Sequence, residues 1–333
     1  MAELATPRAI IRAMLQGIPL ARPLVAPIVF SLGARLENLP LREFLSNPTK
    51  IASALRQLRG ALALDGVTCY FDPYLEAEAL GCDVRWNEGG ASRTLQPPSK
   101  NGGALRERLP SADEVVQLGR IPVACEVVRR LKVMLPGEPA LAAGVTGPCA
   151  LALQLTGEAS AEGSVFNDAI EFAAEVTVPV CKSLLDAGAS VIFLREDFTV
   201  IQSRQRWADL LNPVINVIRF YEALPVVLPA MTTAAATLTA SSGACEGLIC
   251  PVAIEPSAVI SPQVAVSGAV FLPIQELLCS ESNDAAIGGW LQSTTSRLAL
   301  SFITTQEDIA ADTDIRRLAS LFKSIQGGSR RIA

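Results

Sequence analysis

The chain has 333 residues, half of them hydrophobic, and its 28 Lys and Arg against 33 Asp and Glu give a net charge of −5. This length suits one large α/β barrel or two modest domains. Without a block of Lys and Arg, a nucleic-acid-binding stripe is excluded. No apolar stretch reaches the ~18 uncharged residues of a membrane span, and residues 1–15 lack a signal-peptide core. We expect a cytoplasmic protein.

The sequence contains no histidine. Ser-His-Asp and Cys-His mechanisms, and zinc sites with a histidine ligand, are therefore excluded from this chain alone. Acid–base chemistry must come from Asp, Glu, Lys, Tyr, Cys or the substrate. The eight cysteines form no CxxC motif and lie mostly in apolar runs, so we expect them to be buried as small hydrophobic residues.

Short apolar runs recur along the chain, and most are continuous rather than alternating. Such runs are typical of strands buried on both faces, as in parallel sheets. The pattern predicts eight strands, at 23–31, 66–72, 139–147, 190–197, 225–231, 247–251, 264–272 and 298–305.

Amphipathic stretches between these runs predict helices. Ser111 and Glu114 form a capping-box pattern that starts one of them, and Gly188 ends another just before a strand. The predicted helices cover 48–64, 112–135, 164–187, 203–222, 283–296 and 313–326.

This alternation predicts an α/β fold, a (β/α)₈ TIM barrel, with a doubly wound sheet as the alternative. No linker divides the chain, so we expect one barrel domain over 1–333. The Pro- and Gly-rich segment 87–110 predicts a long surface excursion or hairpin that is a candidate lid.

Functional side chains of such a barrel lie at the carboxyl ends of the strands. Asp72 ends one strand, where it is either a turn or cap residue or a carboxylate in the mouth. Glu76 and Glu78 cannot share a helix face, and we expect Glu76 inside and Glu78 in solvent. The rule also selects Ser31, Arg35, Tyr74, Thr146, Cys149, Arg195, Glu196, Asp197, Met231, Thr232, Cys250, Gln306, Glu307 and Asp308.

Several of these residues have two interpretations. Arg195, Glu196 and Asp197 either form ion pairs or bind substrate, with Arg195 on a carboxylate or phosphate. Arg35 is an anion-binding or a solvated helix residue. Glu307 and Asp308 either join the site or place negative charge at a helix start. Gly147 predicts a tight turn that lets a ligand approach, and Met231 is expected in the core or the pocket wall.

Four stretches together resemble the uroporphyrinogen decarboxylase superfamily. They are "FDPYLEAEALGCDVRW" (71–86), "AGVTGPCALALQLTG" (143–157), "LLDAGASVIFLRED" (184–197) and "SFITTQEDIAADTDIRRLASL" (301–321), and they resemble segments at the family's second, third, fourth and last strands. The resemblance runs from about residue 8 to residue 327 and implies a (β/α)₈ barrel.

The resemblance implies one of two chemistries. Decarboxylases of the superfamily remove acetate carboxyls from a porphyrinogen without a cofactor, through an Arg-rich motif after the first strand and the strand-two Asp. Other members move methyl groups to or from corrinoid proteins, thiols or tetrahydrofolate. Many of these hold zinc through a His-x-Cys after strand five and a Cys near the C-terminus.

The sequence departs from both patterns. Only Arg35 stands where the decarboxylases have two arginines. Pro229 and Met231 replace the zinc-binding His and Cys, and Glu307 replaces the third ligand. We therefore expect no metal, since a soft zinc site needs these ligands. The "EAEALGC" motif and segment 31–60 resemble the methyltransferase branch more closely than the decarboxylases.

The resemblance thus implies a methyltransferase-type enzyme that moves a one-carbon unit between a small-molecule substrate and a corrinoid protein or tetrahydrofolate, with no tightly bound cofactor. Its expected catalytic residues are Asp72, Glu76 and Glu307. The alternatives are a cofactor-independent decarboxylase of uroporphyrinogen or a related substrate, and a non-catalytic barrel that binds a tetrapyrrole or pterin. A homodimer is an expectation by analogy alone. The expected substrate-binding residues are Arg35, Tyr74, Gly147, Arg195, Glu196, Asp197, Met231 and Asp308.

Overall fold

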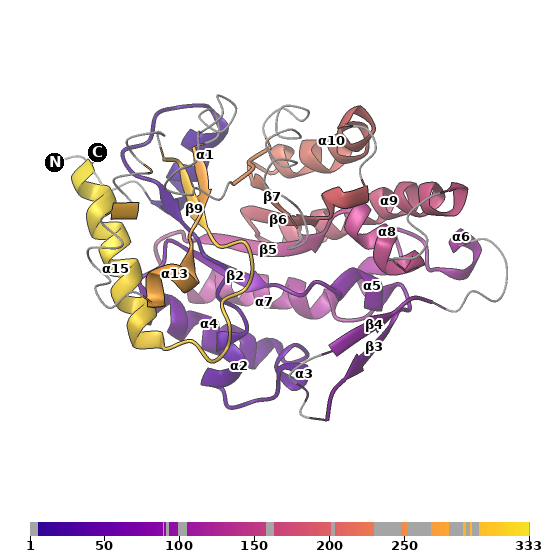
Figure 1. Ribbon diagram of the computed structural model, residues 1–333, viewed down its shortest axis with the longest axis horizontal. Coiled ribbons are helices and arrows are strands. Elements are labelled where there is room, and N and C mark those ends of the chain that lie inside the picture. Colours follow the sequence, from indigo (N-terminus) through magenta and orange to yellow (C-terminus); the bar gives the residue numbers. More distant parts are fainter. Residues whose placement is uncertain are drawn as a thin grey trace.

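The computed structural model describes residues 6–88, 90, 93–98, 105–157, 163–200, 204–229, 248–251, 268–279, 289–290, 294 and 300–332. Figure 1 shows how the chain is arranged. The strands are β1 (Leu24–Val25), β2 (Gly66–Tyr70), β3 (Asp83–Trp86), β4 (Arg93–Gln96), β5 (Ala140–Thr146), β6 (Val191–Glu196), β7 (Leu224–Pro229), β8 (Ala269–Phe271) and β9 (Phe302–Thr304).

Helices separate most of these strands. The α-helices are α1 (Pro7–Leu15), α2 (Leu32–Leu36), α3 (Leu41–Phe44), α4 (Pro48–Leu62), α5 (Leu75–Ala79), α6 (Leu105–Arg108), α7 (Ile121–Met134), α8 (Pro148–Thr156), α9 (Ser164–Ala187), α10 (Arg204–Phe220), α13 (Ile274–Cys279) and α15 (Ile315–Ile332). Two short 3₁₀ helices are η1 (Val115–Gln117) and η3 (Phe198–Val200).

Parallel strands follow one another in two hydrogen-bonded arcs. One arc has the order β2-β5-β6-β7 and continues through a parallel bridge from Val226 to Ile249, and the other has the order β1-β9-β8. Asp65 joins the arcs, because it accepts the backbone N–H of Val25 at 3.0 Å just before β2 begins. All eight predicted runs thus contribute to the parallel strands in chain order. This is the predicted (β/α)₈ barrel.

The strands are buried on both faces, which explains why their sequences are continuously apolar. Every residue of β2, β5 and β7 is buried. The rings of Phe193 on β6 and Phe302 on β9 meet at 6.4 Å between centroids, although these strands are far apart in the sheet order. Side chains therefore fill the barrel lumen, as in other (β/α)₈ barrels.

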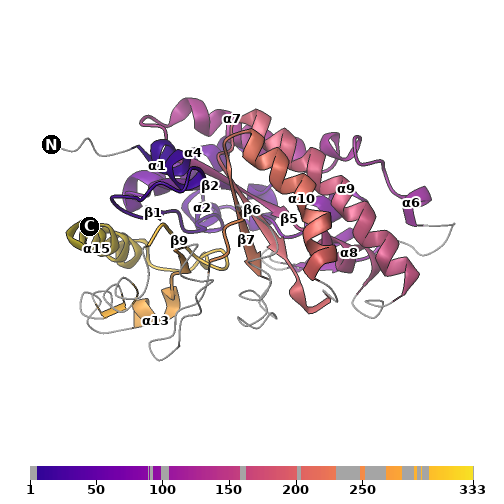
Figure 2. The same ribbon diagram turned by 90° about the horizontal axis from the view of Figure 1, so that it is seen from above.

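Helices cover the outside of the barrel. Figure 2 shows α7, α9 and α10 along one side of the parallel strands, with α15 beside β9. Within the part of the chain that the structure describes, none of the helices has both the length and the apolar composition that a bilayer crossing requires.

Two predicted elements differ in detail. The capping box is present, with Ser111 Oγ 2.7 Å from the Glu114 carboxylate, but it opens only the short helix η1. Gly119 then takes a positive φ of 54° against the backbone of Ala79, and α7 begins at Ile121. The prediction of one helix over 112–135 is therefore wrong. The helix over 283–296 lies largely outside the described residues.

The segment after β2 forms a hairpin rather than a loop alone. Strands β3 and β4 pair antiparallel, with Trp86 opposite Arg93. Figure 1 shows this hairpin along the lower right edge of the molecule, beside α3 and α5.

Gly66 tests how closely the strands approach. A Cβ there would lie 2.9 Å from the Ala26 Cβ and 3.1 Å from the Ala140 carbonyl oxygen. We expect Gly66→Ala to lower the free energy of unfolding in urea by about 1–3 kcal/mol, because overpacking moves backbone. Apart from its chain neighbours and the backbone of α4 itself, no described residue would place a heavy atom within 4 Å of a Cβ on Gly60. The control Gly60→Ala should instead stabilise by about 0.5–1 kcal/mol; equal effects of the two substitutions would contradict the packing described.

Candidate functional site

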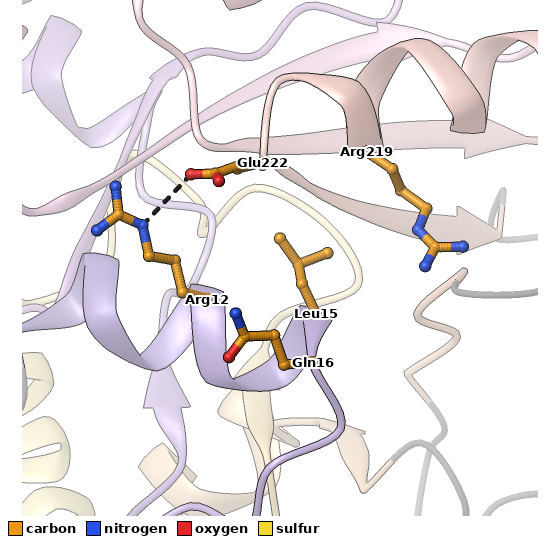
Figure 3. A pocket seen from close by; sticks show the side chains of 5 residues that line it. All are labelled: Arg12, Leu15, Gln16, Arg219 and Glu222. Atoms are coloured by element: carbon orange, nitrogen blue, oxygen red, sulfur yellow. Dashed lines mark ion pairs between the residues drawn. The ribbon is translucent and has the colours of Figure 1, made fainter.

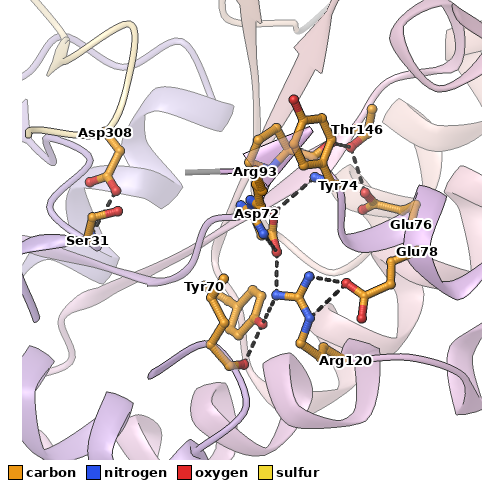
Figure 4. A network of polar contacts seen from close by, with 12 residues as sticks. Ser31, Tyr70, Asp72, Tyr74, Glu76, Glu78, Arg93, Arg120, Thr146 and Asp308 are labelled. Atoms are coloured by element: carbon orange, nitrogen blue, oxygen red, sulfur yellow. Dashed lines mark hydrogen bonds and ion pairs between the residues drawn. The ribbon is translucent and has the colours of Figure 1, made fainter. Parts of the chain in front are cut away.

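Asp72 lies directly after β2 at the carboxyl end of the barrel strands. Its side chain has no exposed surface, and both carboxylate oxygens are held by arginines. Arg93 Nη2 lies 2.5 Å from Oδ1, and Arg120 Nη1 binds Oδ2. The backbone N–H of Tyr74 also donates to Oδ1 at 2.9 Å. Asp72 therefore joins the end of β2 to the hairpin and to the start of α7 (Figure 4).

The two arginines have further partners. Arg120 binds the Glu78 carboxylate and donates to the Tyr70 hydroxyl at 3.2 Å. Arg93 lies between two rings, 5.1 Å from the Tyr74 centroid and 4.9 Å from that of Trp86. The network thus contains two cations and two carboxylates, which balance its charge.

This network determines the protonation of Asp72. Burial alone raises the pKa of a carboxyl, but Arg120 and Arg93 outweigh it and hold the pKa of Asp72 below its usual value. Asp72 is thus an ionised carboxylate whose oxygens are already engaged.

Glu76 lies one turn further along, on α5, and is fully buried. Thr146 at the end of β5 donates to its Oε2 at 2.6 Å, while its Oε1 finds no hydrogen-bond partner in the described part of the chain. Burial raises the pKa of Glu76 to about 7. The charged and titratable groups that face it are Asp72 and, from α9, the Cys181 thiol.

Thr146 has a second acceptor within reach. Its hydroxyl lies 3.3 Å from the Pro73 carbonyl oxygen, which also accepts Gln154 Nε2 at 2.9 Å. One hydroxyl proton cannot serve both acceptors fully. When Glu76 is protonated it can donate to Thr146, and Thr146 can then donate to Pro73, next to Asp72. Neutral Glu76 therefore suits this arrangement better than its carboxylate.

Glu196 and Gly147 form a separate unit. The buried Glu196 carboxylate accepts the backbone N–H of Ala150 at 2.9 Å, in the first turn of α8, and that of Asp197 at 3.1 Å. A Cβ on Gly147 would lie 2.6 Å from Glu196 Oε2. Burial raises the pKa of Glu196 to about 7, although these N–H groups lower it. Glu196 is thus engaged by the start of α8.

Arg195 and Glu307 form an ion pair that links the ends of β6 and β9. Arg195 Nη2 lies 3.3 Å from Glu307 Oε1, and its guanidinium lies 6.0 Å from the ring centroid of Phe71. Since side chains two apart on a strand share a face, Arg195 lies one layer above Phe193 of the lumen. This ion pair lies at the carboxyl ends of β6 and β9 and joins two charged groups that the sequence analysis selected separately.

The other predicted residues have local partners. Asp308 accepts the backbone N–H groups of Phe30 and Ser31, both at 2.8 Å, and burial raises its pKa to about 6. Arg35 is exposed and donates to two carbonyls of the segment before α15. Asp197 accepts the backbone and hydroxyl of Thr199. Met231 and Thr232 lie outside the described residues.

Sequence reasoning missed Arg93 and Arg120, and its expectation that Glu78 lies in solvent is wrong. Glu78 is only partly exposed and binds Arg120. No local pattern announces these contacts, since Arg93 and Arg120 lie 21 and 48 residues from Asp72. The one available signal was indirect, because a buried carboxylate needs a cation.

The described residues do not fit a zinc ion at the mouth. They include no cluster of His, Cys, Asp or Glu that could hold a metal. The Pro229 carbonyl accepts Gln306 Nε2 at 3.4 Å, and Glu307 is paired with Arg195.

A cavity of about 210 Å³ lies between the ends of α1 and α10 (Figure 3). Arg12 and Glu222 form an ion pair across it at 3.4 Å. Because α1 and α10 end where β1 and β7 begin, this cavity is at the end of the barrel opposite the strand-end residues.

Asp72→Asn tests the anchoring role. It would leave three charges, two of them cations, in a largely buried network, so we expect a loss of about 3–5 kcal/mol in the free energy of unfolding. Asp83→Asn breaks an exposed pair with Arg85 and should cost less than about 0.5 kcal/mol. Unchanged stability of Asp72→Asn would refute the anchoring role.

Glu76→Gln tests the neutral carboxyl. Burial raises the pKa of folded Glu76 to about 7, whereas the ordinary pKa of a glutamate side chain is 4.5. Stability from this group is therefore complete below pH 4.5 and is lost as the pH rises to about 7. At about 1.4 kcal/mol per pKa unit, Glu76→Gln should remove roughly 3 kcal/mol of that decline in urea unfolding. The exposed Glu43→Gln is the control, and an unchanged decline in Glu76→Gln would refute the prediction.

Comparisons with known proteins agree with the fold. A methyltransferase from Methanosarcina mazei is similar in structure, with a TM-score of 0.73 and 17% identity, covering 97% of this chain and 98% of that one. A protein named as a phosphonomutase from Burkholderia cenocepacia has a TM-score of only 0.41 at 11% identity, covering 90% of this chain and 92% of that one. No match was found among curated proteins.

The family is shown by sequence. Residues 6–230 match the family described as uroporphyrinogen decarboxylase (URO-D). This match covers more than half of the 333 residues. The chain belongs to the uroporphyrinogen decarboxylase family.

Proposed function

We propose that the protein is a methyltransferase-type enzyme of this family, which moves a one-carbon unit to or from a corrinoid protein or tetrahydrofolate without a thiolate-zinc site. The observation that carries this proposal is the (β/α)₈ barrel shared, over nearly its whole length, with the Methanosarcina mazei methyltransferase. The carrier would supply or accept the methyl group; this chain would bind and orient the small-molecule substrate.

The three expected catalytic carboxylates take different parts in this proposal. Glu307 is the one with an exposed side chain at the mouth, 32% exposed, so it is the group that would exchange a proton with substrate. Asp72 has no exposed surface and would position Arg93 and Arg120. Glu76, which is also buried, would position the loop that carries Asp72.

Decarboxylation of uroporphyrinogen is the second candidate, and the family match favours it. Its substrate carries eight carboxylates and needs several cations. By resemblance, Arg35 is the arginine that would bind these carboxylates. In the structure it donates to the carbonyls of Ala311 and Thr313. Asp72, which would contact the pyrrole nitrogens, is engaged by Arg93 and Arg120. The geometry therefore supports methyl transfer better.

A direct assay separates the candidates. The protein is incubated with a corrinoid protein and a panel of methyl donors, and visible spectra follow the cobalt state. Methyl-cobalt formation is expected, and Glu307→Gln should slow it by about 10²–10⁴-fold, the usual contribution of acid–base catalysis. Glu43→Gln, at an exposed position of α3, is the matched control.

Two results would overturn the proposal. Coproporphyrin formed from uroporphyrinogen, with no cobalt response, would establish the decarboxylase. No turnover in either assay, together with tight binding of a tetrapyrrole or pterin, would establish a binding barrel.

A further inference from the structure

Arg195 is held above an apolar floor. Its side chain is 17% exposed, and its guanidinium lies over the Phe71 ring, 6.0 Å from the centroid. On β6 the buried Phe193 precedes it by two residues and therefore shares its face of the strand. A guanidinium so placed has lost most of its water, and an anion that reaches it is bound more strongly than at the surface.

One edge of this guanidinium is incompletely paired. The Nε and Nη2 groups of arginine share an edge, which can donate two parallel hydrogen bonds to a carboxylate. Here Nη2 contacts Glu307 Oε1 at 3.3 Å, a long contact, while the buried Nε has no hydrogen-bond partner among the residues that the structure describes. Glu307 therefore occupies half of a site for a planar anion.

The two members of the pair differ in how firmly they are held. Arg195 is the less exposed and rests on Phe71, whereas Glu307 is 32% exposed and follows β9 on a loop. An incoming anion would therefore displace Glu307 and leave Arg195 in place. Released from Arg195, Glu307 becomes free to accept a proton.

We propose that the Nε–Nη2 edge of Arg195 binds a carboxylate of the substrate, which displaces Glu307. This rests on the proposed function, which makes the mouth the substrate site and methyl transfer the reaction. A carboxylate is favoured over other anions because a carboxylate of this chain already lies on the same edge. The substrate class is then a small methyl-donating or methyl-accepting carboxylic acid.

Calorimetric titration of the full chain tests the exchange. The probes are methoxyacetate, its neutral counterpart 2-methoxyacetamide, and inorganic phosphate. We expect methoxyacetate to bind and the amide not to. Arg195→Gln should weaken binding by at least about tenfold, since a hydrogen-bonded ion contributes about 1.5–3 kcal/mol. Arg195→Lys, which keeps the charge but not the planar edge, should also weaken it.

Glu307→Ala gives the distinguishing result. Removing the competing carboxylate should tighten binding of methoxyacetate, up to about fivefold for a partly exposed ion pair. Arg106→Gln, in an exposed pair with Glu175, is the matched control and should change nothing.

Several outcomes would overturn the proposal. They are equal binding of the amide, preference for phosphate, unchanged binding in both Arg195 variants, or weaker binding in Glu307→Ala. Circular dichroism of each variant shows whether it is folded, and Arg195→Lys decides the question if Arg195→Gln is not. Binding is measured without a methyl donor. A failure here thus leaves the methyl-transfer assay unaffected, and the reverse also holds.

Discussion

The arrangement of the barrel mouth depends on the burial of one carboxylate, that of Asp72, between two arginines. A buried carboxylate without partners would be too costly to keep ionised. Arg93 from the hairpin and Arg120 from the start of α7 therefore have to meet at the end of β2. This one contact brings together three segments far apart in the sequence. Tyr74 and the start of α5, which carries Glu76, are placed by the same contact, through the Tyr74 N–H.

The sequence predicted the barrel because its main signal is local. Strands buried on both faces require continuous apolar runs, and all eight runs coincide with parallel strand segments. The inward position of Glu76 was also predicted from a local signal, since it follows from helix geometry. Arg93 and Arg120 were not predicted, because an ion pair between distant residues leaves no periodic pattern. The start of α7 was missed for a backbone reason, the positive φ of Gly119 that separates the capping box from the helix.

The acidic residues at the strand ends differ in pKa because their surroundings differ, and their sequence context does not reveal this difference. Arginines keep Asp72 ionised, while burial raises the pKa of Glu76 and of Glu196. Glu196 is further committed to the first turn of α8, which Gly147 allows to come close. Strand-end position alone selects all of these residues, but Glu307 differs from them because its side chain is 32% exposed and is paired with Arg195 through one long contact.

The residues at the positions where the resemblance implies zinc ligands have other partners in this chain. Where resemblance places soft zinc ligands, this chain has the Pro229 carbonyl bonded to Gln306 and the Glu307 carboxylate paired with Arg195. A metal would orient a substrate through coordination. A guanidinium fixed on aromatic rings orients it through charge and a planar edge, and for this it requires an anionic group on the substrate. In the proposed function, an ion pair with Arg195 would therefore take the place of metal coordination at this end of the barrel, which requires a substrate with an anionic group.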